Sequence, residues 1–430
     1  MSNRPSGWKD AELSEFCEII QGQSPPSDTY NRDATGLPFF QGKTDFGLVN
    51  PTARVWCTAP SKIAEAGDIL ISIRAPVGPT NIADEQCAIG RGIAAIRPLG
   101  GITTSFVTHA IRFRESQLQR VATGSTFSAV SGPQLRALSL PLPPLLEQRR
   151  IVAEIEKQFT RLDQTNVSIQ NNKRRLVQLN SSVLEETFAE FRDDVCDLGE
   201  ISDIQGGIQK QPKNRPVKNI RPFLRVANVL RGRLNLQDVH GIEVFGSEAE
   251  RLRLEAGDLL IVEGNGSPGE IGRMAIWDGS IADCIHQNHI IRARLRPNVL
   301  PGFIEAYWNS PTGSRAVRSV ASSTSGLHTL SVNKVKQIPC PVPTIERQET
   351  ALTKIDRITS TIEATTRALE ASSSRAARLR QAILAKAFSG QLVPQDPNDE
   401  PASILLDRIR AERNADALRG ETSAPQKRRL

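Results

Sequence analysis

An internal repeat constrains the architecture of this chain more than any other feature of its sequence. Residues 131–188 align without a gap onto residues 331–388, at a constant offset of 200. The identical pairs include Pro141 with Pro341, Pro143 with Pro343, Gln148 with Gln348, Ile155 with Ile355, Leu179 with Leu379 and Phe188 with Phe388. Shorter matches precede this block in each half, among them Ala-Gly-Asp at 66–68 and at 256–258. The chain is therefore a tandem duplication, and whatever fold one half adopts should occur twice.

Each half begins with a segment whose pattern indicates short β-strands, with Gly, Pro, Asn and Asp at the turns. The two Ala-Gly-Asp units predict a turn that leads into a buried strand, and we expect Asp258 to cap the second turn. We expect later strands at 89–96 and 285–295, and a short helix near 105–122 and again near 302–321. Each half thus predicts one β-rich α/β domain.

A proline-rich hinge and a long helical pattern follow each β-rich segment. The hinges are residues 141–144 and 339–343, where proline blocks continuation of regular structure. The apolar residues that follow repeat at the spacing of a coiled-coil seam. They are Val152, Ile155, Phe159, Leu162, Ile169, Leu176 and Val183 in the first helix, and Ile355, Ile358, Ile362, Leu369, Leu379 and Ile383 in the second. Polar Asn166, Lys173, Asn180 and Thr365 interrupt the seams, which favours one specified intramolecular pair over indiscriminate association.

Composition places the chain among proteins with their own hydrophobic cores. It has 430 residues, 39% of them hydrophobic, and a net charge of +7, which is compatible with nucleic-acid binding but does not demand it. No apolar run reaches the ~18 residues of a membrane span, and residues 1–9 lack the apolar core of a signal peptide. The six cysteines have no paired spacing, so neither zinc nor a disulfide framework is expected. We therefore expect a soluble, cytoplasmic protein without contact to a membrane.

The motifs of common enzymes are missing from the sequence. It contains no phosphate-binding Gly-x-x-x-x-Gly-Lys-[Ser/Thr], no Gly-x-Ser-x-Gly and no Asn-Pro-Pro-[Phe/Tyr] of amino-methyltransferases. Asp258 and Glu263 resemble nuclease carboxylates, but Asn265 stands where a lysine would be needed, so we interpret this pair as structural. We expect no catalytic residues.

Cys284, His286 and His289 form the one metal-like cluster of the sequence. On a strand, His286 shares a face with Cys284 while His289 lies on the other face, which separates the three ligands. We therefore expect no metal site. The alternative, which we prefer, is that His286 and Asn288 point together at a partner surface, where the first repeat has Ile89 and Arg91.

The distribution of charge points to an anionic partner. Residues 209–233 contain eight basic and no acidic residues, and so many uncompensated charges in one domain indicate contact with a phosphate backbone. We expect phosphate contacts from Lys210, Lys213 and Arg215, and base contacts from Arg225, Asn228, His286 and Asn288. In the first domain, where basic residues are scattered, the candidates are Lys43, Arg74, Arg91, Ser125 and Thr126. Similar helices with divergent β domains suggest one scaffold that carries two specificities.

Three segments make the chain resemble the specificity subunit of a type I restriction–modification system. They are Pro-Leu-Pro-Pro-Leu-Leu-Glu-Gln-Arg-Arg-Ile-Val at 141–152, Arg-Pro-Phe-Leu-Arg-Val-Ala-Asn-Val at 221–229, and Phe-Ser-Gly-Gln-Leu-Val-Pro-Gln-Asp at 388–396 running on to Ala411, Glu412 and Arg413. The resemblance covers nearly the whole chain. One departure is that Glu-Arg-Gln-Glu at 346–349 replaces Glu-Gln-Arg-Arg at 147–150, so contacts at the two helix starts should differ.

The resemblance implies an α+β fold in which two β-rich recognition domains are joined by two long antiparallel coiled-coil helices with pseudo-twofold symmetry. The expected segments are recognition domains at 1–143 and 194–343, helices at 144–193 and 344–390, and a tail at 391–430 with a short helix at 402–413. It also implies a non-catalytic reader of double-stranded DNA that binds no cofactor itself. Its implied partners are two modification subunits, which methylate adenine with S-adenosylmethionine, and restriction subunits that use ATP and Mg²⁺. The rival interpretation is an oligomerisation scaffold whose β domains bind protein.

Overall fold

The chain folds into two compact units. The computed structural model describes residues 5–122, 129–209, 217–265, 270–324 and 327–422. Unit 1 comprises Met1–Ser168 and Ser372–Leu430, and unit 2 comprises Ile169–Ala371. Both boundaries fall inside the long helices, so each unit contains one β-rich domain and a part of each helix. The expected pseudo-twofold relation concerns the placement of one unit relative to the other and stays a prediction.

Unit 1 contains a four-stranded antiparallel sheet in the order β2-β10-β7-β8 and a five-stranded sheet in the order β3-β5-β4-β9-β6. A two-stranded ladder of β1 and β11 leads to the long helix. The elements are β1 (Lys9–Glu12), α1 (Leu13–Phe16), β2 (Cys17–Gln21), η1 (Ser27–Thr29), β3 (Tyr30–Asn31), β4 (Leu37–Phe40), η2 (Lys43–Asp45), β5 (Trp56–Cys57), β6 (Ile63–Ala64), β7 (Ile69–Ser72), β8 (Thr80–Ile82), β9 (Cys87–Ile89), β10 (Ile93–Pro98), α2 (Thr104–Phe113), α3 (Glu115–Val121), α4 (Gly132–Arg136), β11 (Ser139–Leu142) and α12 (Ala402–Thr422).

Unit 2 repeats this design, with a four-stranded sheet in the order β13-β22-β18-β20. Its elements are β12 (Val195–Asp197), α6 (Leu198–Ile201), β13 (Ser202–Gly206), β14 (Ile220–Leu224), η4 (Val226–Asn228), β15 (Val229–Leu230), β16 (Arg233–Leu234), β17 (His240–Glu243), α7 (Glu248–Leu252), β18 (Leu259–Val262), β19 (Gly264–Asn265), β20 (Met274–Ile276), β21 (Ile285–His286), β22 (Ile290–Leu295), α8 (Pro301–Asn309), α9 (Pro311–Val320), β23 (Ser322–Thr324), β24 (Leu327–Thr329), α10 (Val332–Lys336) and β25 (Pro339–Pro341). The shared strand order confirms that the sequence repeat is a repeat of fold.

The strand after each Ala-Gly-Asp unit lies between two hydrophobic cores. In β7, Ile69 and Ile71 belong to the core that includes α2, while Leu70 belongs to the core on the other side of the sheet. Strand β18 divides its residues in the same way. Because side chains alternate across a strand, burial on both faces requires an unbroken apolar run. This explains the apolar runs that follow the two turns, Ile-Leu-Ile at 69–71 and Leu-Leu-Ile at 259–261.

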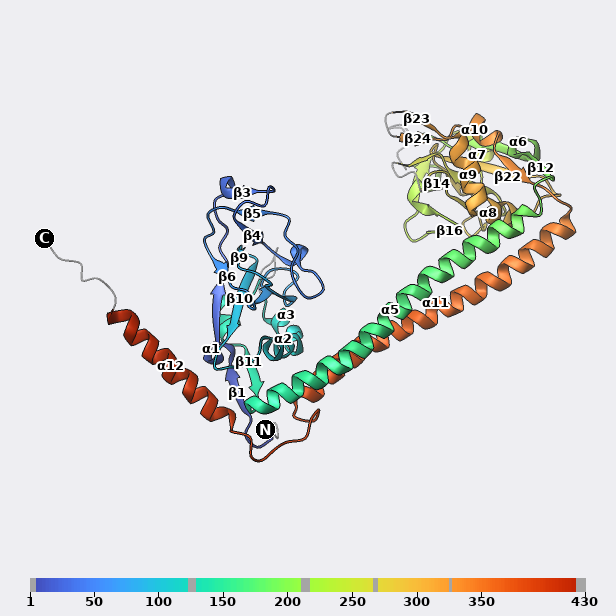
Figure 1. Cartoon of the computed structure of the whole chain (residues 1–430). Helices are drawn as coiled ribbons and strands as arrows, with labels where there is room; N and C mark the ends of the chain where they lie inside the picture. Colours follow the sequence, from blue (N-terminus) through green and yellow to red (C-terminus); the bar gives the residue numbers. More distant parts are fainter. Residues whose placement is uncertain (1–4, 123–128, 210–216, 266–269, 325–326, 423–430) are drawn as a thin grey trace. The chain divides into compact units, whose positions relative to one another are not determined.

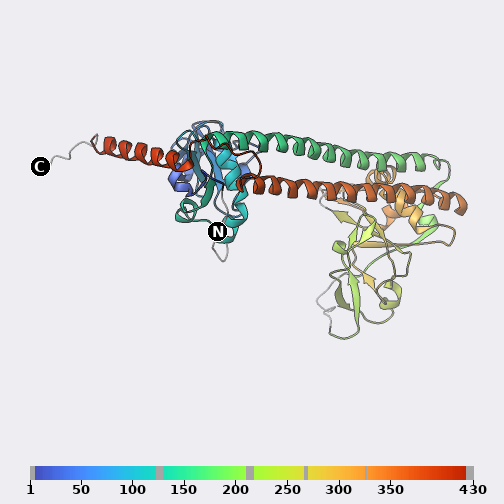
Figure 2. The same cartoon turned by 90° about the horizontal axis from the view of Figure 1, so that it is seen from below.

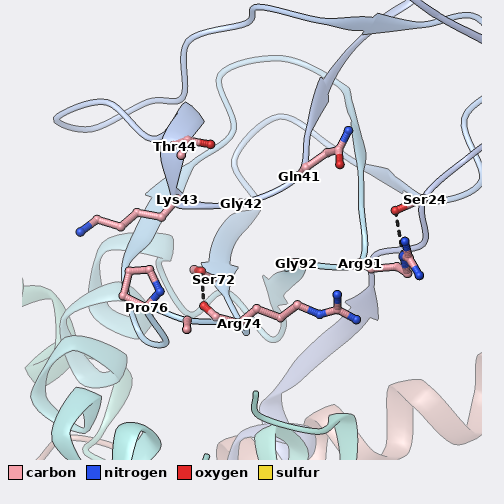
Figure 3. A pocket seen from close by; sticks show the side chains of 11 residues that line it. Ser24, Gln41, Gly42, Lys43, Thr44, Ser72, Arg74, Pro76, Arg91 and Gly92 are labelled. Carbon is pink, nitrogen blue, oxygen red and sulfur yellow. Dashed lines mark hydrogen bonds between the residues drawn. The ribbon is translucent and has the colours of Figure 1, made fainter. Parts of the chain in front are cut away.

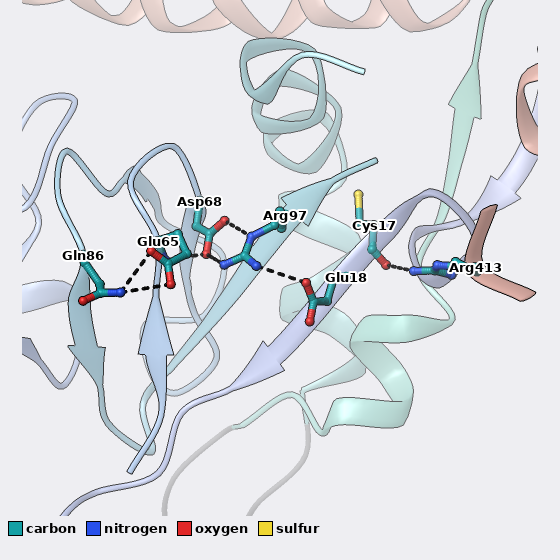
Figure 4. A network of polar contacts seen from close by, with 7 residues as sticks. All are labelled: Cys17, Glu18, Glu65, Asp68, Gln86, Arg97 and Arg413. Carbon is teal, nitrogen blue, oxygen red and sulfur yellow. Dashed lines mark hydrogen bonds and ion pairs between the residues drawn. The ribbon is translucent and has the colours of Figure 1, made fainter. Parts of the chain in front are cut away.

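The aspartate of each unit caps its turn, as predicted for Asp258, and also anchors the neighbouring strand. Asp68 Oδ2 accepts a hydrogen bond from the Glu65 backbone N–H at 2.8 Å. The same carboxylate binds both Nε and Nη2 of Arg97, at 2.9 and 2.8 Å, from strand β10 (Figure 4). In unit 2, Asp258 makes the corresponding bidentate pair with Arg294, at 2.8 Å for both bonds. The two units therefore share the polar bracing of the sheet as well as its strand order.

The long helices α5 (Leu145–Ala189) and α11 (Ile345–Phe388) pack side by side and antiparallel (Figure 1, Figure 2). In unit 1, Asp163 of α5 pairs with Arg380 near the end of α11. In unit 2, Lys354 near the start of α11 pairs with Glu190, just beyond the end of α5, at 3.5 Å. The predicted seam needs one correction, because Leu379 is 47% exposed while Ala376 and Ile383 are buried. A straight helix drifts relative to a strict heptad, so the apolar stripe moves off Leu379.

The C-terminal tail packs against the first domain. Ala402, Leu405, Leu406 and Ile409 of α12 enter the same core as α2. Arg410 pairs with Glu15 at 2.6 Å, so α12 lies against α1 (Figure 1). The helix extends beyond the expected end at residue 413, to Thr422. The tail thus contributes to the fold of unit 1.

Two expectations about local structure are wrong in detail. Each expected helix near 105–122 and 302–321 is a pair of short helices, and the second pair is separated by Ser310, whose hydroxyl caps α9 by accepting from Gly313 N–H at 3.1 Å. Each expected strand at 89–96 and 285–295 is broken by a turn. Among the described residues, no helix has both the length and the apolar character needed to cross a bilayer.

Candidate nucleic-acid interface

Three of the predicted DNA-binding residues of the first domain line one hollow. Lys43, Arg74 and Arg91 border a hollow of about 430 Å³ (Figure 3). The other lining residues are Ser24, Gln41, Gly42, Thr44, Ser72, Ala75, Pro76 and Gly92. The structure therefore brings together basic side chains that lie 48 positions apart in the sequence at their extremes. We call the site of Gln41, Lys43, Arg74, Arg91 and Gly92, together with the buried Ile73 next to Arg74, corner 1.

The sheet builds corner 1 from three strand ends. Lys43 begins the short helix η2 after β4, Arg74 follows β7, and Arg91 lies in the turn between β9 and β10. Backbone hydrogen bonds hold these ends together, with Ile73 N–H donating to Gly92 O at 3.0 Å and Gly90 N–H to Phe40 O at 2.8 Å. Loops on such a scaffold can vary while their positions stay fixed.

The electrostatics of corner 1 suit an anionic ligand. All three basic side chains are exposed. Among the described residues, no carboxylate forms an ion pair with Lys43, Arg74 or Arg91; Arg91 Nε donates instead to Ser24 Oγ at 3.2 Å. Arginine can bind a phosphate or the O6 and N7 acceptors of guanine, and lysine can bind either as a point charge. Corner 1 can thus supply both backbone and base contacts.

Unit 2 contains the equivalent site, which we call corner 2. Two pairs of cross-strand neighbours establish the match: Ala94 pairs with Ile71 in the sheet of unit 1, and Ile291 pairs with Ile261 in the sheet of unit 2. The bond from Glu263 N–H to His289 O, at 3.0 Å, repeats the bond between Ile73 and Gly92. By this match Glu263 corresponds to Ile73, Gly264 to Arg74, Asn288 to Arg91 and His289 to Gly92. The parallel pairing of β4 with β9, repeated by β14 with β21, makes Arg225 correspond to Gln41. One backbone arrangement therefore carries two different sets of side chains.

Corner 2 contains two of the predicted residues and two that sequence reasoning set aside. Arg225 and Asn288 are both partly exposed there, although Arg225 already pairs with Asp238 at 2.6 Å. Glu263, interpreted from sequence as structural, accepts at Oε2 from His289 Nδ1 at 2.9 Å. The repeat alignment was the available signal, because it places Glu263 one position before the equivalent of Arg74.

Two predicted base contacts are wrong because the side chains are buried. Asn228 is 3% exposed; its Oδ1 accepts from Arg225 N–H at 2.8 Å, and its Nδ2 donates to carbonyl oxygens of Asn235 and Asp238, both at 2.9 Å. His286 is fully buried, with Nδ1 at 2.9 Å from Ile290 O. Burial lowers the pKa of His286 to about 4, so the ring is neutral at pH 7. Both side chains stabilise turns and do not face a partner.

The basic run of the second domain is partly compensated by carboxylates from outside it. Arg221 pairs with Asp283, and Arg225 with Asp238. The argument from uncompensated charge therefore fails for these two arginines. Five further candidates, Ser125, Thr126, Lys210, Lys213 and Arg215, lie outside the described residues. Within the described part of the chain, no three His, Cys, Asp or Glu side chains come together as metal ligands.

Comparisons with known proteins agree with this architecture. The family model of the type I restriction modification DNA specificity domain matches residues 5–176. The StySPI specificity subunit of Salmonella potsdam is 22% identical across 95% of this chain and 96% of its own, and the EcoKI specificity subunit of Escherichia coli K12 is 25% identical across 77% and 76%. A putative MjaX specificity subunit of Methanocaldococcus jannaschii is 37% identical over 35% of this chain and 36% of its own.

Solved structures show the same fold. A chain from a type I restriction–modification system, studied for its complex assembly and conformational transition, has a TM-score of 0.72 at 21% identity, covering 90% of this chain and 99% of that one. The HsdS subunit of Thermoanaerobacter tengcongensis has a TM-score of 0.54 at 21% identity, over 90% and 98%. Together with the matches along nearly the whole sequence, these likenesses show that the chain is similar to the specificity subunits of type I restriction–modification systems and shares their fold.

Proposed function

We propose that the chain reads a bipartite, asymmetric DNA site, with corner 1 contacting one half and corner 2 the other. The observation that carries this proposal is the pairing of a common scaffold with different side chains. Corner 1 presents Lys43, Arg74 and Arg91. In corner 2, Gly264 and Asn288 stand at the positions of Arg74 and Arg91, and Glu263 stands at the position of Ile73. Two domains of one fold with different polar groups select different base sequences.

The long helix pair would then act as a ruler for the unread spacer between the two halves. Helices α5 and α11 contain 45 and 44 residues. At ~1.5 Å per residue each is about 65 Å long. Ion pairs between the helices in both units support a stiff pair. A stiff connection converts helix length into a defined number of base pairs, as dimer geometry sets half-site spacing in other DNA-binding proteins.

The partners follow from the proposed role. We infer that two modification subunits bind this chain and methylate adenine with S-adenosylmethionine, and that restriction subunits using ATP and Mg²⁺ join the complex. Adenine would have to leave the base stack to reach a catalytic pocket on a modification subunit. We infer that the chain acts in the cytoplasm, on double-stranded DNA.

Selection from duplexes with a randomised stretch tests the proposal directly. The purified full chain is incubated with the pool, and the bound duplexes are sequenced. We expect a motif in two parts, separated by an unread spacer of constant length. Replacing the three cations of corner 1 by glutamine should alter one part and leave the other. A single continuous motif would contradict the two-part site, and the absence of any motif would favour a protein-binding scaffold.

A further inference from the structure

Corner 2 contains an acidic side chain at a place where a DNA-binding surface should avoid one. Glu263 follows strand β18, and its side chain is 32% exposed. Its backbone is fixed on both sides, because its N–H donates to His289 O at 3.0 Å and its O accepts from Leu330 N–H at 2.7 Å. The equivalent residue in corner 1, Ile73, is buried and apolar. The exposed carboxylate is thus a property of the second domain alone.

A carboxylate beside DNA is unfavourable unless it meets a hydrogen-bond donor. Phosphates repel it, and the acceptors of guanine and the O4 of thymine offer it no hydrogen. The donors in the major groove are the exocyclic amino groups, N4 of cytosine and N6 of adenine. A glutamate in this position therefore rejects two bases by repulsion and accepts the other two through a hydrogen bond, which is how specificity is commonly achieved.

The neighbours of Glu263 complete such a base-reading site. His289 Nδ1 contacts Oε2 at 2.9 Å, which orients the carboxylate and leaves Oε1 as a second acceptor. Asn288, on the adjacent position of the turn, is partly exposed, and its backbone N–H is bonded to Ile208 O at 2.9 Å. An asparagine side chain both donates and accepts, as adenine N6 and N7 require. The corner thus combines a fixed acceptor with a bifunctional amide.

We propose that Glu263 is a specificity-determining residue that selects an exocyclic amino group, on cytosine or adenine, at one position of the half-site read by the second domain. This inference rests on the proposed function, since it requires that corner 2 faces DNA. It assigns to Glu263 a role in discrimination more than in affinity. Removing its charge should therefore reduce selectivity while unrelated DNA is bound as well as before or better.

The test compares four full-length proteins by selection from randomised duplexes: wild type, Glu263→Gln, Glu250→Gln and His289→Gln. Glu250 is the matched control, because it is an exposed carboxylate on α7 paired with Arg253 at 3.9 Å. We expect Glu263→Gln to lower the preference for cytosine or adenine at one position by about five-fold or more. The base that is enriched there in the wild type tells which amino group is read. Glu250→Gln should leave the motif unchanged.

The outcomes separate the inference from the proposed function. A wild-type motif in two parts that persists unchanged in Glu263→Gln overturns the inference and leaves the proposed function standing. Without such a motif in the wild type, both fall. His289→Gln keeps the carboxylate and should keep the preference. If it loses the preference as fully as Glu263→Gln, or if Glu263→Gln weakens binding to every duplex alike, the pair merely positions the turn, and the base-reading role is refuted.

Discussion

Replacing Lys43, Arg74 and Arg91 together with glutamine should remove a large part of the salt dependence of DNA binding. The three side chains are exposed around one hollow, so a single DNA backbone can meet all of them. Glutamine keeps most of the side-chain length and the capacity for hydrogen bonds while removing the charge. The perturbation therefore tests electrostatic contact and leaves the fold of the sheet edge intact.

The magnitude follows from counterion release. Each neutralised phosphate contributes about 0.9 to the slope of log K against log salt concentration, so three lost contacts lower the slope by about 2.7. Between 50 and 200 mM salt, the affinity of the wild type should then fall about 40-fold more than that of the variant. Part of the effect would be missing if one of the three cations reads a base without touching a phosphate.

Fluorescence anisotropy with a labelled duplex, at four or five salt concentrations, measures this slope. The matched control replaces Arg136, Arg149 and Arg161 by glutamine, which removes the same charge from exposed positions of unit 1 on α4 and α5. Only long-range attraction should change in the control, and its slope should stay within about 0.5 of the wild type. Equal slopes for the two triple variants would show that corner 1 does not contact DNA.

Three further predictions concern stability and spacing. Asp68→Asn should destabilise unit 1 by about 2 kcal/mol in urea unfolding, because Asp68 is 2% exposed and makes two hydrogen bonds to Arg97. The control is Glu18→Gln, which removes the 51% exposed carboxylate paired with the same arginine and should cost less than about 0.5 kcal/mol. Burial lowers the pKa of His286 to about 4, so as pH falls the unfolded chain takes up a proton near pH 6.5, before the folded chain does. The contribution of His286 to the free energy of unfolding is therefore fully present above pH 6.5 and is lost as pH falls toward 4, by about 2 kcal/mol at pH 5. Unfolding curves at pH 8 and pH 5 should show a smaller loss of stability for His286→Gln than for the wild type. One heptad inserted in both long helices, about 10 Å, should lengthen the selected spacer by about three base pairs, and an unchanged spacer in the selection assay would disprove the ruler.

The sequence predicted the long-range organisation better than the site. Helix starts at 145 and 345 agree closely with the proline hinges, because proline restricts the backbone locally and leaves a clear signal. The burial of His286 could not be predicted from the alternation of polar and apolar residues along the strand. Both faces of β21 are buried, so the sequence there does not alternate between inward and outward residues. Asp283 and Asp238, the carboxylates that pair with Arg221 and Arg225, lie 62 and 13 positions away in the sequence, and only the fold brings them close. The trio of corner 1 was predicted as scattered residues, and the sheet is what gathers it.

The two corners show how one fold can carry two specificities at little cost in stability. The elements that hold the sheet together are the same in both units: the apolar strand buried on both faces, and the buried aspartate that binds an arginine on the neighbouring strand. The corner positions lie just beyond the ends of these strands, where backbone hydrogen bonds fix their place and the side chains of Arg74 and Asn288 reach solvent. Substitutions at such exposed positions usually change stability by less than about 0.5 kcal/mol, whereas one base contact is worth about 1–3 kcal/mol of discrimination. Corner residues that reach solvent can therefore be replaced with little effect on folding and a strong effect on the choice of DNA. Exchanging Arg91 and Asn288 between the two domains should accordingly alter the selected half-sites while both units stay folded.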